Sequence, residues 1–169
     1  MSSETLLRDV QDQFWRATED LLFHHTNPWE LDEALTEFGF SMGPCEAQDL
    51  VGLEKVLARC PERNGPVLKR MVAEGRLGKI GGVGHYRYPG GGGAVIDPLI
   101  EDLIREEAWF AKIDRFDLSD DELVLRMIEC LRSVLGHLKE SGVSRADLDE
   151  AVVSGLHYPK DKLGLLHNS

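Results

Sequence analysis

Apolar residues recur at steps of three and four positions along most of this 169-residue chain, and this spacing constrains the fold more than any other feature. Leu7, Val10, Phe14, Ala17 and Leu21 set the pattern near the start of the chain. Side chains with that spacing lie on one face of an α-helix. We therefore predict two long amphipathic helices, over residues 3–25 and 119–142, and shorter helices over 27–39, 44–60, 65–75, 97–107 and 144–155.

Residue types that start and end helices stand at the edges of these segments. Asn27 is followed by Pro28, and a proline suits the first helical position. Ser119-Asp-Asp-Glu122 has the pattern of a capping box, in which the serine and the glutamate satisfy free backbone N–H groups. Glycines follow the predicted helices, as expected where a helix ends.

Residues 76–96 differ in kind from the rest, since eight glycines from Gly78 to Gly93 crowd around two tyrosines. Such a composition predicts tight turns, with room for a short hairpin. Gly82 and Gly84 begin a G-x-G pattern, but Arg87 stands where a dinucleotide-binding turn needs its third glycine. We predict that this chain has no nucleotide cradle of its own and binds no cofactor by itself.

The two ends of the chain carry the same tetrapeptide. Leu31-Asp-Glu-Ala34 and Leu148-Asp-Glu-Ala151 each follow a long helix and a capped start, and each precedes a glycine, an aromatic residue and a proline. The shared order of these features favours an internal duplication over chance. We predict an all-α fold of two related helical repeats. Residues 1–96 form the first, with the glycine-rich segment as its tail, and residues 97–169 form the second, shorter one.

The net charge of −11 is unevenly distributed. Residues 41–96 carry five acidic and eight basic side chains, whereas the flanking segments are acidic. Nucleic-acid binding depends on clustered lysine and arginine, so the acidic balance argues against such a partner. The basic middle indicates either a site for an anionic ligand, such as a phosphorylated cofactor, or a solvated face of mixed charge.

Cysteine, histidine and hydropathy patterns argue against several further classes. Cys45, Cys60 and Cys130 are far apart and form no C-x-x-C pair, which predicts neither a disulfide framework nor a metal site. The adjacent His24 and His25 diverge on a helix, and we interpret them as a solvated helix end. No apolar run reaches the roughly 20 residues of a membrane span and no signal pattern is present, so we predict no membrane partner and a cytoplasmic location.

Two longer motifs occupy residues 29–58 and 68–88. The first contains Leu31-Asp-Glu-Ala, Gly39-Phe-Ser-Met-Gly-Pro44 and Asp49-Leu-Val-Gly-Leu53; the second runs from Leu68-Lys-Arg-Met to His85-Tyr-Arg-Tyr88. Together they resemble the C-terminal domain of 3-hydroxyacyl-CoA dehydrogenases, whose patterns are G-x-x-x-P-M-G-P, D-x-x-G-L-D and L-x-x-M-V-x-x-G-R-L-G-x-K-x-G-x-G-F-Y-x-Y. Residues from Leu125 to Pro159 are similar to the duplicated helical domain of the β-oxidation multienzyme subunit.

This resemblance implies a 6-phosphogluconate dehydrogenase C-terminal-like fold and a place in fatty acid metabolism. Enzymes of the family oxidise 3-hydroxyacyl-CoA with NAD, using a His–Glu pair in a preceding nucleotide-binding domain, while the helical domain closes the acyl-CoA cleft and often dimerises. We expect this chain to lack that domain and to meet NAD only through a partner chain. The partners implied are a second copy, as a homodimer, or a separate nucleotide-binding dehydrogenase domain. Trp15, Trp29 and Trp109 are candidates for a docking surface or for the core.

The resemblance also decides which residues are candidates for the site. The family's catalytic-site Asn-Arg pair aligns with Leu7-Arg8, and leucine cannot hydrogen-bond a substrate oxygen, so we expect no catalytic residue in this chain. An alternative is a repurposed helical binding or scaffold protein without the chemistry, which Leu7 favours. The basic middle and the intact Met42-Gly43-Pro44 favour acyl-CoA binding. The substrate-binding candidates are Arg8, Met42, Gly43, Pro44, Lys69, Arg70, Arg76 and Lys79.

Overall fold

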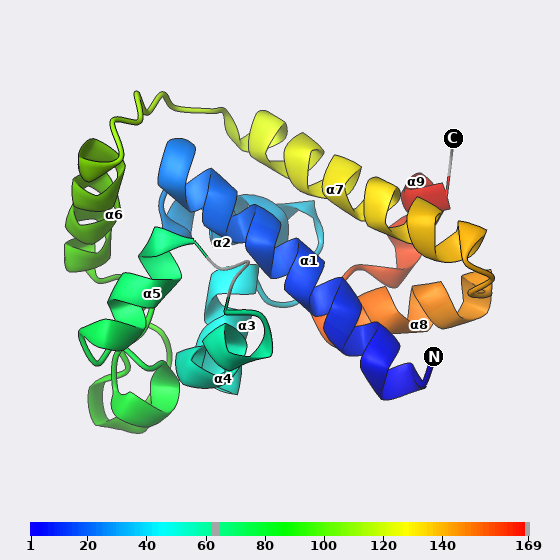
Figure 1. Cartoon of the computed structure of the whole chain (residues 1–169), viewed down its shortest axis with the longest axis horizontal. Coiled ribbons are helices and arrows are strands. Elements are labelled where there is room, and N and C mark those ends of the chain that lie inside the picture. Colours follow the sequence, from blue (N-terminus) through cyan, green and yellow to red (C-terminus); the bar gives the residue numbers. More distant parts are fainter. Residues whose placement is uncertain (62–64, 168–169) are drawn as a thin grey trace.

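The computed structural model describes residues 1–61 and 65–167, and within these residues the chain is all-helical. Figure 1 shows the long helix α1 (Ser3–His24) crossing the middle of the molecule and α7 (Asp120–Glu140) running back above it. Short 3-10 turns cover Lys79–Gly81, Pro89–Gly91 and Lys160–Lys162. The α-helices are α1 (Ser3–His24), α2 (Pro28–Phe38), α3 (Pro44–Val51), α4 (Leu53–Arg59), α5 (Pro66–Ala73), α6 (Pro98–Phe110), α7 (Asp120–Glu140), α8 (Arg145–Leu156) and α9 (Gly164–His167).

The predicted starts of the helices are confirmed by their caps. The Asn27 side chain accepts from the backbone N–H of Glu30 at 2.9 Å, with Pro28 in the first turn. Ser119 and Glu122 form the capping box at the start of α7. Such caps satisfy N–H groups that a helix leaves free at its first turn. Sequence alone therefore located these ends correctly.

One predicted helix, over residues 44–60, is wrong, because the chain breaks at Gly52 between α3 and α4. Gly52 has φ 103°, a left-handed conformation that favours glycine. The break leaves the N–H of Leu53 free to donate to the carbonyl of Leu77, at 2.9 Å, in the glycine-rich segment. Besides its two 3-10 turns, that segment forms isolated antiparallel bridges, which join Gly78 with Val83, Val83 with Arg87, and Arg87 with Val95.

A second interpretation, that His25 lies at a solvated helix end, is also wrong. The linker between α6 and α7 crosses the end of α1, and there the guanidinium of Arg115 donates to the carbonyls of Leu22, Phe23 and Thr26. His25 is buried beneath this linker, with Nδ1 2.9 Å from the carbonyl oxygen of Phe116. A distant arginine thus satisfies the carbonyls at this helix end.

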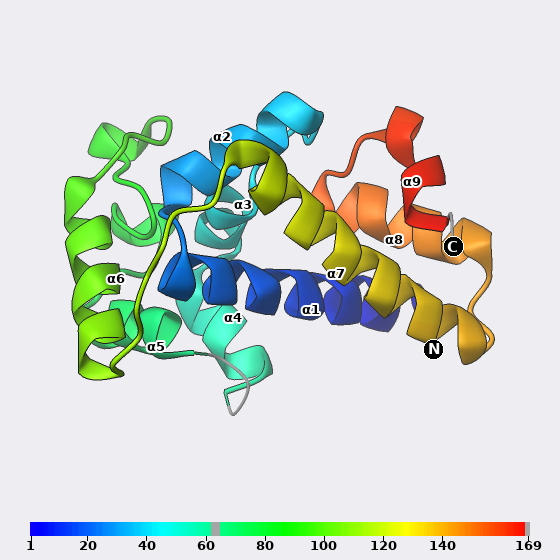
Figure 2. The same ribbon diagram turned by 90° about the horizontal axis from the view of Figure 1, so that it is seen from above.

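The two segments that share the tetrapeptide pack reciprocally. Helix α1 packs against α7 and α8, and α2 packs against α7. Where the segments meet, Phe40 and Tyr158 form an edge-to-face pair with centroids 5.3 Å apart, and the N–H of Ser41 donates to the carbonyl of His157 at 3.1 Å. Helix α6 lies at the opposite end of the molecule from α9 (Figure 2) and packs against α1 and α5. The division at residue 96 stays a prediction.

The core runs along the apolar faces of these helices. Its fully buried side chains come from both halves of the chain, so a single core joins them. Burial of large aliphatic side chains supplies most of the driving force for such packing. The largest fully buried side chains are those of Phe14, Leu22, Leu31, Leu35, Leu53, Met71, Ile100, Ile104, Leu123, Met127, Leu131 and Leu135.

Candidate functional site

The glycine-rich segment is held by Asp49, which lies near the end of α3 and is buried. One carboxylate oxygen accepts from the backbone N–H of His85 and lies 2.9 Å from its ring Nδ1, and the other accepts from the N–H of Tyr86 and the hydroxyl of Tyr88. A side chain at Gly84 would place its Cβ 2.4 Å from Asp49 Oδ1. Gly84 is therefore needed for the loop to reach this carboxylate.

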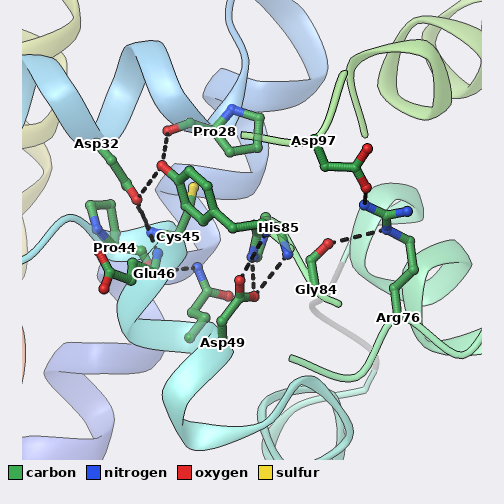
Figure 3. A network of polar contacts seen from close by, with 12 residues as sticks. Pro28, Asp32, Pro44, Cys45, Glu46, Asp49, Arg76, Gly84, His85 and Asp97 are labelled. Carbon is green, nitrogen blue, oxygen red and sulfur yellow. Dashed lines mark hydrogen bonds and ion pairs between the residues drawn. The ribbon is translucent and has the colours of Figure 1, made fainter. Parts of the chain in front are cut away.

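A second buried carboxylate, Asp32 on α2, caps α3. Its two oxygens accept from the backbone N–H groups of Cys45 at 2.9 Å and Glu46 at 3.0 Å, and the hydroxyl of Tyr86 donates to it at 2.8 Å. Figure 3 shows Asp32 reaching across to this helix start beside Pro44. Burial raises the pKa of Asp32 to about 6, although these hydrogen bonds oppose the rise.

Glu19 on α1 repeats the arrangement at the start of α5. Its carboxylate accepts from the backbone N–H groups of Val67 at 3.1 Å and Leu68 at 2.9 Å. Burial raises the pKa of Glu19 to about 7, and the two backbone hydrogen bonds lower it only in part. Glu19 on α1 thus caps the start of α5, and Asp32 on α2 caps the start of α3. Asp49 on α3 holds the glycine-rich loop.

The Asp49–His85 pair has the composition of a catalytic dyad but not its exposure. Burial lowers the pKa of His85, and the adjacent Asp49 carboxylate more than reverses this, so that the pKa is raised. His85 is 3% exposed and Asp49 is 1% exposed. A general base must reach a substrate proton, which this imidazole cannot do in this conformation. We interpret the pair as structural.

The sequence does not reveal these three carboxylates as a group. The signal available was the glycine that faces each of them. A Cβ would lie 2.3 Å from Asp32 at Gly43, 2.6 Å from Glu19 at Gly65 and 2.4 Å from Asp49 at Gly84. The motifs Gly43-Pro44 and Gly65-Pro66 were visible in the sequence. The carboxylate that faces each glycine could not be recognised in the sequence, because it comes from another helix.

The predicted substrate-binding residues do not come together in one site. Gly43 and Pro44 are buried beneath Asp32, and Met42 is half-buried beside them. Arg8 is exposed on α1 near the N-terminal end and pairs with Glu4 at 3.3 Å. The four basic candidates on and after α5, Lys69, Arg70, Arg76 and Lys79, lie toward the other end of the molecule (Figure 1).

Two of these four basic side chains are already engaged. Arg76 donates to Asp97 at 2.6 Å and to the carbonyl of Gly84 at 3.1 Å, and so ties the loop to the start of α6 (Figure 3). Arg70 pairs with Glu74, Glu106 and Glu107 at 3.0 to 3.5 Å. Lys69 and Lys79 form no ion pair with the residues that the structure describes. Arg70 and Arg76 are thus less available to a phosphate than their charge suggests.

Leu7, which the sequence resemblance predicts to take the place of the family's asparagine, lines an open groove of about 410 Å³, which we call the N-terminal groove. Its apolar side chains come from α1, α7 and α8, and its rim carries serines and two carboxylates, Asp147 and Glu150. Leu7 itself is half-buried, because α8 approaches closely: a Cβ at Gly155 would lie 3.0 Å from Leu7. The lining residues are Met1, Ser3, Leu6, Leu7, Leu138, Ser141, Gly142, Val143, Ser144, Asp147, Glu150, Ala151 and Ser154.

A second groove, of about 320 Å³, lies between α5 and α6 and is lined by Leu99, Leu103 and five charged residues.

Among residues 1–61 and 65–167, no cluster of three or more His, Cys, Asp or Glu side chains could hold a metal ion. No helix within the same residues is long and apolar enough to cross a bilayer.

Comparison with known proteins gives one family. Residues 7–88 match 3-hydroxyacyl-CoA dehydrogenase, C-terminal domain. The chain is 33% identical over 154 residues to the peroxisomal fatty acid beta-oxidation multifunctional protein of Oryza sativa subsp. japonica, which covers 82% of this chain and 21% of that protein. It is 25% identical to the fatty acid oxidation complex subunit alpha of Acinetobacter baumannii (strain SDF), covering 77% of this chain and 20% of that one.

A solved structure shares the fold. The dehydrogenase part of multifunctional enzyme 1 from C. elegans superposes with a TM-score of 0.74 and 21% identity, covering 94% of this chain and 37% of that one. The all-helical fold and the family resemblance expected from the sequence are thereby confirmed. The chain spans about a fifth of the length of the multifunctional proteins it matches.

Proposed function

We propose that this chain, whose residues 7–88 belong to the 3-hydroxyacyl-CoA dehydrogenase C-terminal domain family, is an acyl-CoA-binding module that works in β-oxidation together with a nucleotide-binding dehydrogenase domain. The multifunctional proteins similar to it are named for fatty acid oxidation. The cytoplasm stays our predicted location, although the relatives from Oryza sativa and Arabidopsis thaliana are named peroxisomal.

The N-terminal groove is the observation that carries this proposal. Leu6, Leu7 and Leu138 give it an apolar floor, and apolar grooves of a few hundred cubic ångströms suit small hydrophobic ligands. Asp147 and Glu150 on the rim repel phosphate groups, so the acyl chain enters the groove and the phosphates stay outside. Arg8 is exposed and follows the lining residue Leu7, just as Lys139 follows Leu138 and Arg145 follows Ser144.

Calorimetry with octanoyl-CoA and free CoA tests this binding. We expect octanoyl-CoA to bind more tightly than CoA, and Leu7→Glu to weaken it by at least about tenfold, because a carboxylate in the apolar floor opposes burial of the chain. The matched control is Leu125→Glu, an exposed leucine on α7, which should leave the affinity unchanged. No binding by the parent chain would contradict the proposal.

A separate pair of variants tests where the phosphate groups of CoA bind. We expect Arg8→Ala to weaken octanoyl-CoA binding at low salt more than Lys69→Ala does, since Arg8 adjoins the groove and Lys69 lies on α5. The reverse order would indicate that the phosphate groups bind to the basic middle of the chain, residues 41–96. Arg76→Ala is not a clean probe, because Arg76 also holds Asp97 and Gly84.

Catalysis in this proposal requires a partner. The sequence resemblance aligns the family's asparagine with Leu7, and the Gly82-Val-Gly84 run of the glycine-rich segment lacks its third glycine at Arg87. We expect the purified chain alone to produce no NADH from 3-hydroxyacyl-CoA and NAD, measured by absorbance. Homodimerisation, or docking on a nucleotide-binding domain, is the partnership we propose, and sedimentation would measure it.

A second candidate function is a helical scaffold that has lost substrate binding. Leu7 in place of an amide and the ion pairs of Arg70 and Arg76 favour it, since each removes a polar group from ligand binding. This candidate predicts no measurable affinity for octanoyl-CoA or CoA. The calorimetric experiment therefore separates the two functions.

A further inference from the structure

One face of α6 exposes three large apolar side chains. Leu99 is 64% exposed, Trp109 74% and Phe110 61%. The opposite face of the same helix is buried in the core through Ile100, Leu103, Ile104 and Ala108. Residues 99, 102, 106, 109 and 110 fall on one side of a helix at 100° per residue. We call this side the α6 face, and it lies at one end of the molecule (Figure 2).

The α6 face also carries negative charge. Asp102 and Glu106 stand between Leu99 and Trp109, and both line the groove between α5 and α6 together with Glu74. The two arginines of that groove are neutralised within the chain: Arg70 by Glu74, Glu106 and Glu107, and Arg76 by Asp97. Asp102 forms no ion pair with any residue that the structure describes.

Charge and geometry together define what would cover this face. A surface of exposed aromatic and aliphatic side chains is typical of protein interfaces, where tryptophan contributes strongly to affinity. Interleaved carboxylates, including one without an internal partner, favour a basic partner over a neutral or acidic one. Leu99 and Trp109 are ten residues apart, or about 15 Å along the helix axis, which corresponds to about three turns of a second helix.

We propose that the α6 face binds a basic amphipathic helix of another protein. Apolar side chains of that helix, spaced at three and four residues, cover Leu99, Trp109 and Phe110. A lysine or arginine beside them enters the groove between α5 and α6 and pairs with Asp102. A further cation lies over the Trp109 ring, which attracts positive charge. The proposal is independent of acyl-CoA binding, whose groove is at the other end of the molecule.

A pair of designed peptides tests this proposal on the full chain. The first is a capped 14-residue helix with leucines at helical spacing on one side and lysines on the other, and the second has glutamates in place of the lysines. We expect the lysine peptide to bind in calorimetry, with an affinity that falls as salt rises, and the glutamate peptide to show no binding. The tryptophan fluorescence of the chain should shift to shorter wavelength on binding, and Trp109→Ser should abolish the shift.

Variants of the face locate the binding. Trp109→Ser and Asp102→Lys should each weaken the lysine peptide by at least about tenfold. Leu165→Ser, an exposed leucine on α9 at the far end of the molecule, is the control and should leave the affinity unchanged. Melting temperatures should match the parent, since these side chains are exposed. Equal binding of both peptides, no binding, or an affinity insensitive to Asp102→Lys would each overturn the proposal. So would sedimentation showing that the chain self-associates and that Trp109→Ser abolishes it, because the occupant would then be a second copy.

Discussion

Asp32 and Asp149 occupy the same place in the two copies of Leu-Asp-Glu-Ala, and their surroundings differ. Asp32 is buried and caps α3 from α2. The Asp149 side chain is 25% exposed and contacts His167 at 2.6 Å and Arg145 at 3.8 Å. The same local sequence therefore supplies an internal helix cap in one half and a partly exposed contact with His167 and Arg145 in the other. Three buried carboxylates, Glu19, Asp32 and Asp49, organise the first half, whereas the second half has a buried carboxylate at its start, Asp97.

The largest effect is expected at Asp49, which has no counterpart in the second half. Asp49→Asn should lower the free energy of unfolding by about 3–5 kcal/mol, because the amide replaces one of the two buried oxygens with an NH2 group, which cannot accept from the N–H and hydroxyl donors that surround it. Urea unfolding followed by circular dichroism measures this. Asp161→Asn, at an exposed position in the second half, should change stability by less than about 0.5 kcal/mol. Similar values for both variants would contradict the comparison.

The second effect concerns pH. The pKa of Glu19 is about 7 in the folded chain against 4.5 when exposed, so the folded state binds this proton more tightly. Its contribution to stability is complete below pH 4.5 and is lost as the pH rises through 7, by about 3 kcal/mol at most. The raised pKa of His85 acts in the same direction.

Glu19→Gln tests this directly. The amide keeps an acceptor oxygen for only one of the two N–H groups, those of Val67 and Leu68, but it does not titrate, so the loss of stability between pH 4.5 and pH 8 should become smaller. Unfolding free energies measured at several pH values provide the comparison. Glu33→Gln, an exposed position on α2, is the matched control and should retain the full slope. An unchanged slope in Glu19→Gln would show that Glu19 is ionised throughout.

The third prediction compares the two copies of the tetrapeptide itself. Asp32→Ala should cost about 2 kcal/mol, because it leaves the N–H groups of Cys45 and Glu46 without their acceptor. Asp149→Ala should cost less than about 1 kcal/mol, as is usual for a partly exposed ion pair. Thermal melts of the two variants suffice. Equal losses would mean that Asp149 also has a structural role.

The smallest effect is expected at Leu7, where the two halves meet. Leu7→Asn should cost about 1 kcal/mol, since Leu7 is half-buried in an open groove and only part of its apolar surface leaves water on folding. Chemical unfolding at two protein concentrations measures it. A loss above about 3 kcal/mol that depends on concentration would indicate that a second copy covers the groove.

Several features could be predicted from the sequence because their causes are local. Helix starts at Asn27, Ser119 and Ser144 depend on residues within one turn. The break at Gly52 was missed, since a glycine inside an apolar periodic run is tolerated in many helices. Its positive φ is favoured here by the hydrogen bond from Leu53 to Leu77, which pairs the helix with a distant loop.

The site was predicted less completely than the fold. Met42-Gly43-Pro44 and Arg76 stood out by their type, but the sequence could not show that Gly43 adjoins Asp32 or that Arg76 is held by Asp97. His85 had no partner within its neighbourhood in sequence, and its partner Asp49 lies 36 residues away. Long-range pairs of this kind leave no periodic signal.

The sequence by itself determined the helices, their caps and the family motifs, because helical spacing and capping act over three or four residues. Only the tertiary structure decided which carboxylates are buried, which arginines are neutralised and which leucines stay exposed. Those properties depend on partners brought together by packing, and the free energy of a charge depends on its burial and its neighbours. Asp32 and Asp149 are identical in local sequence and differ for that reason alone.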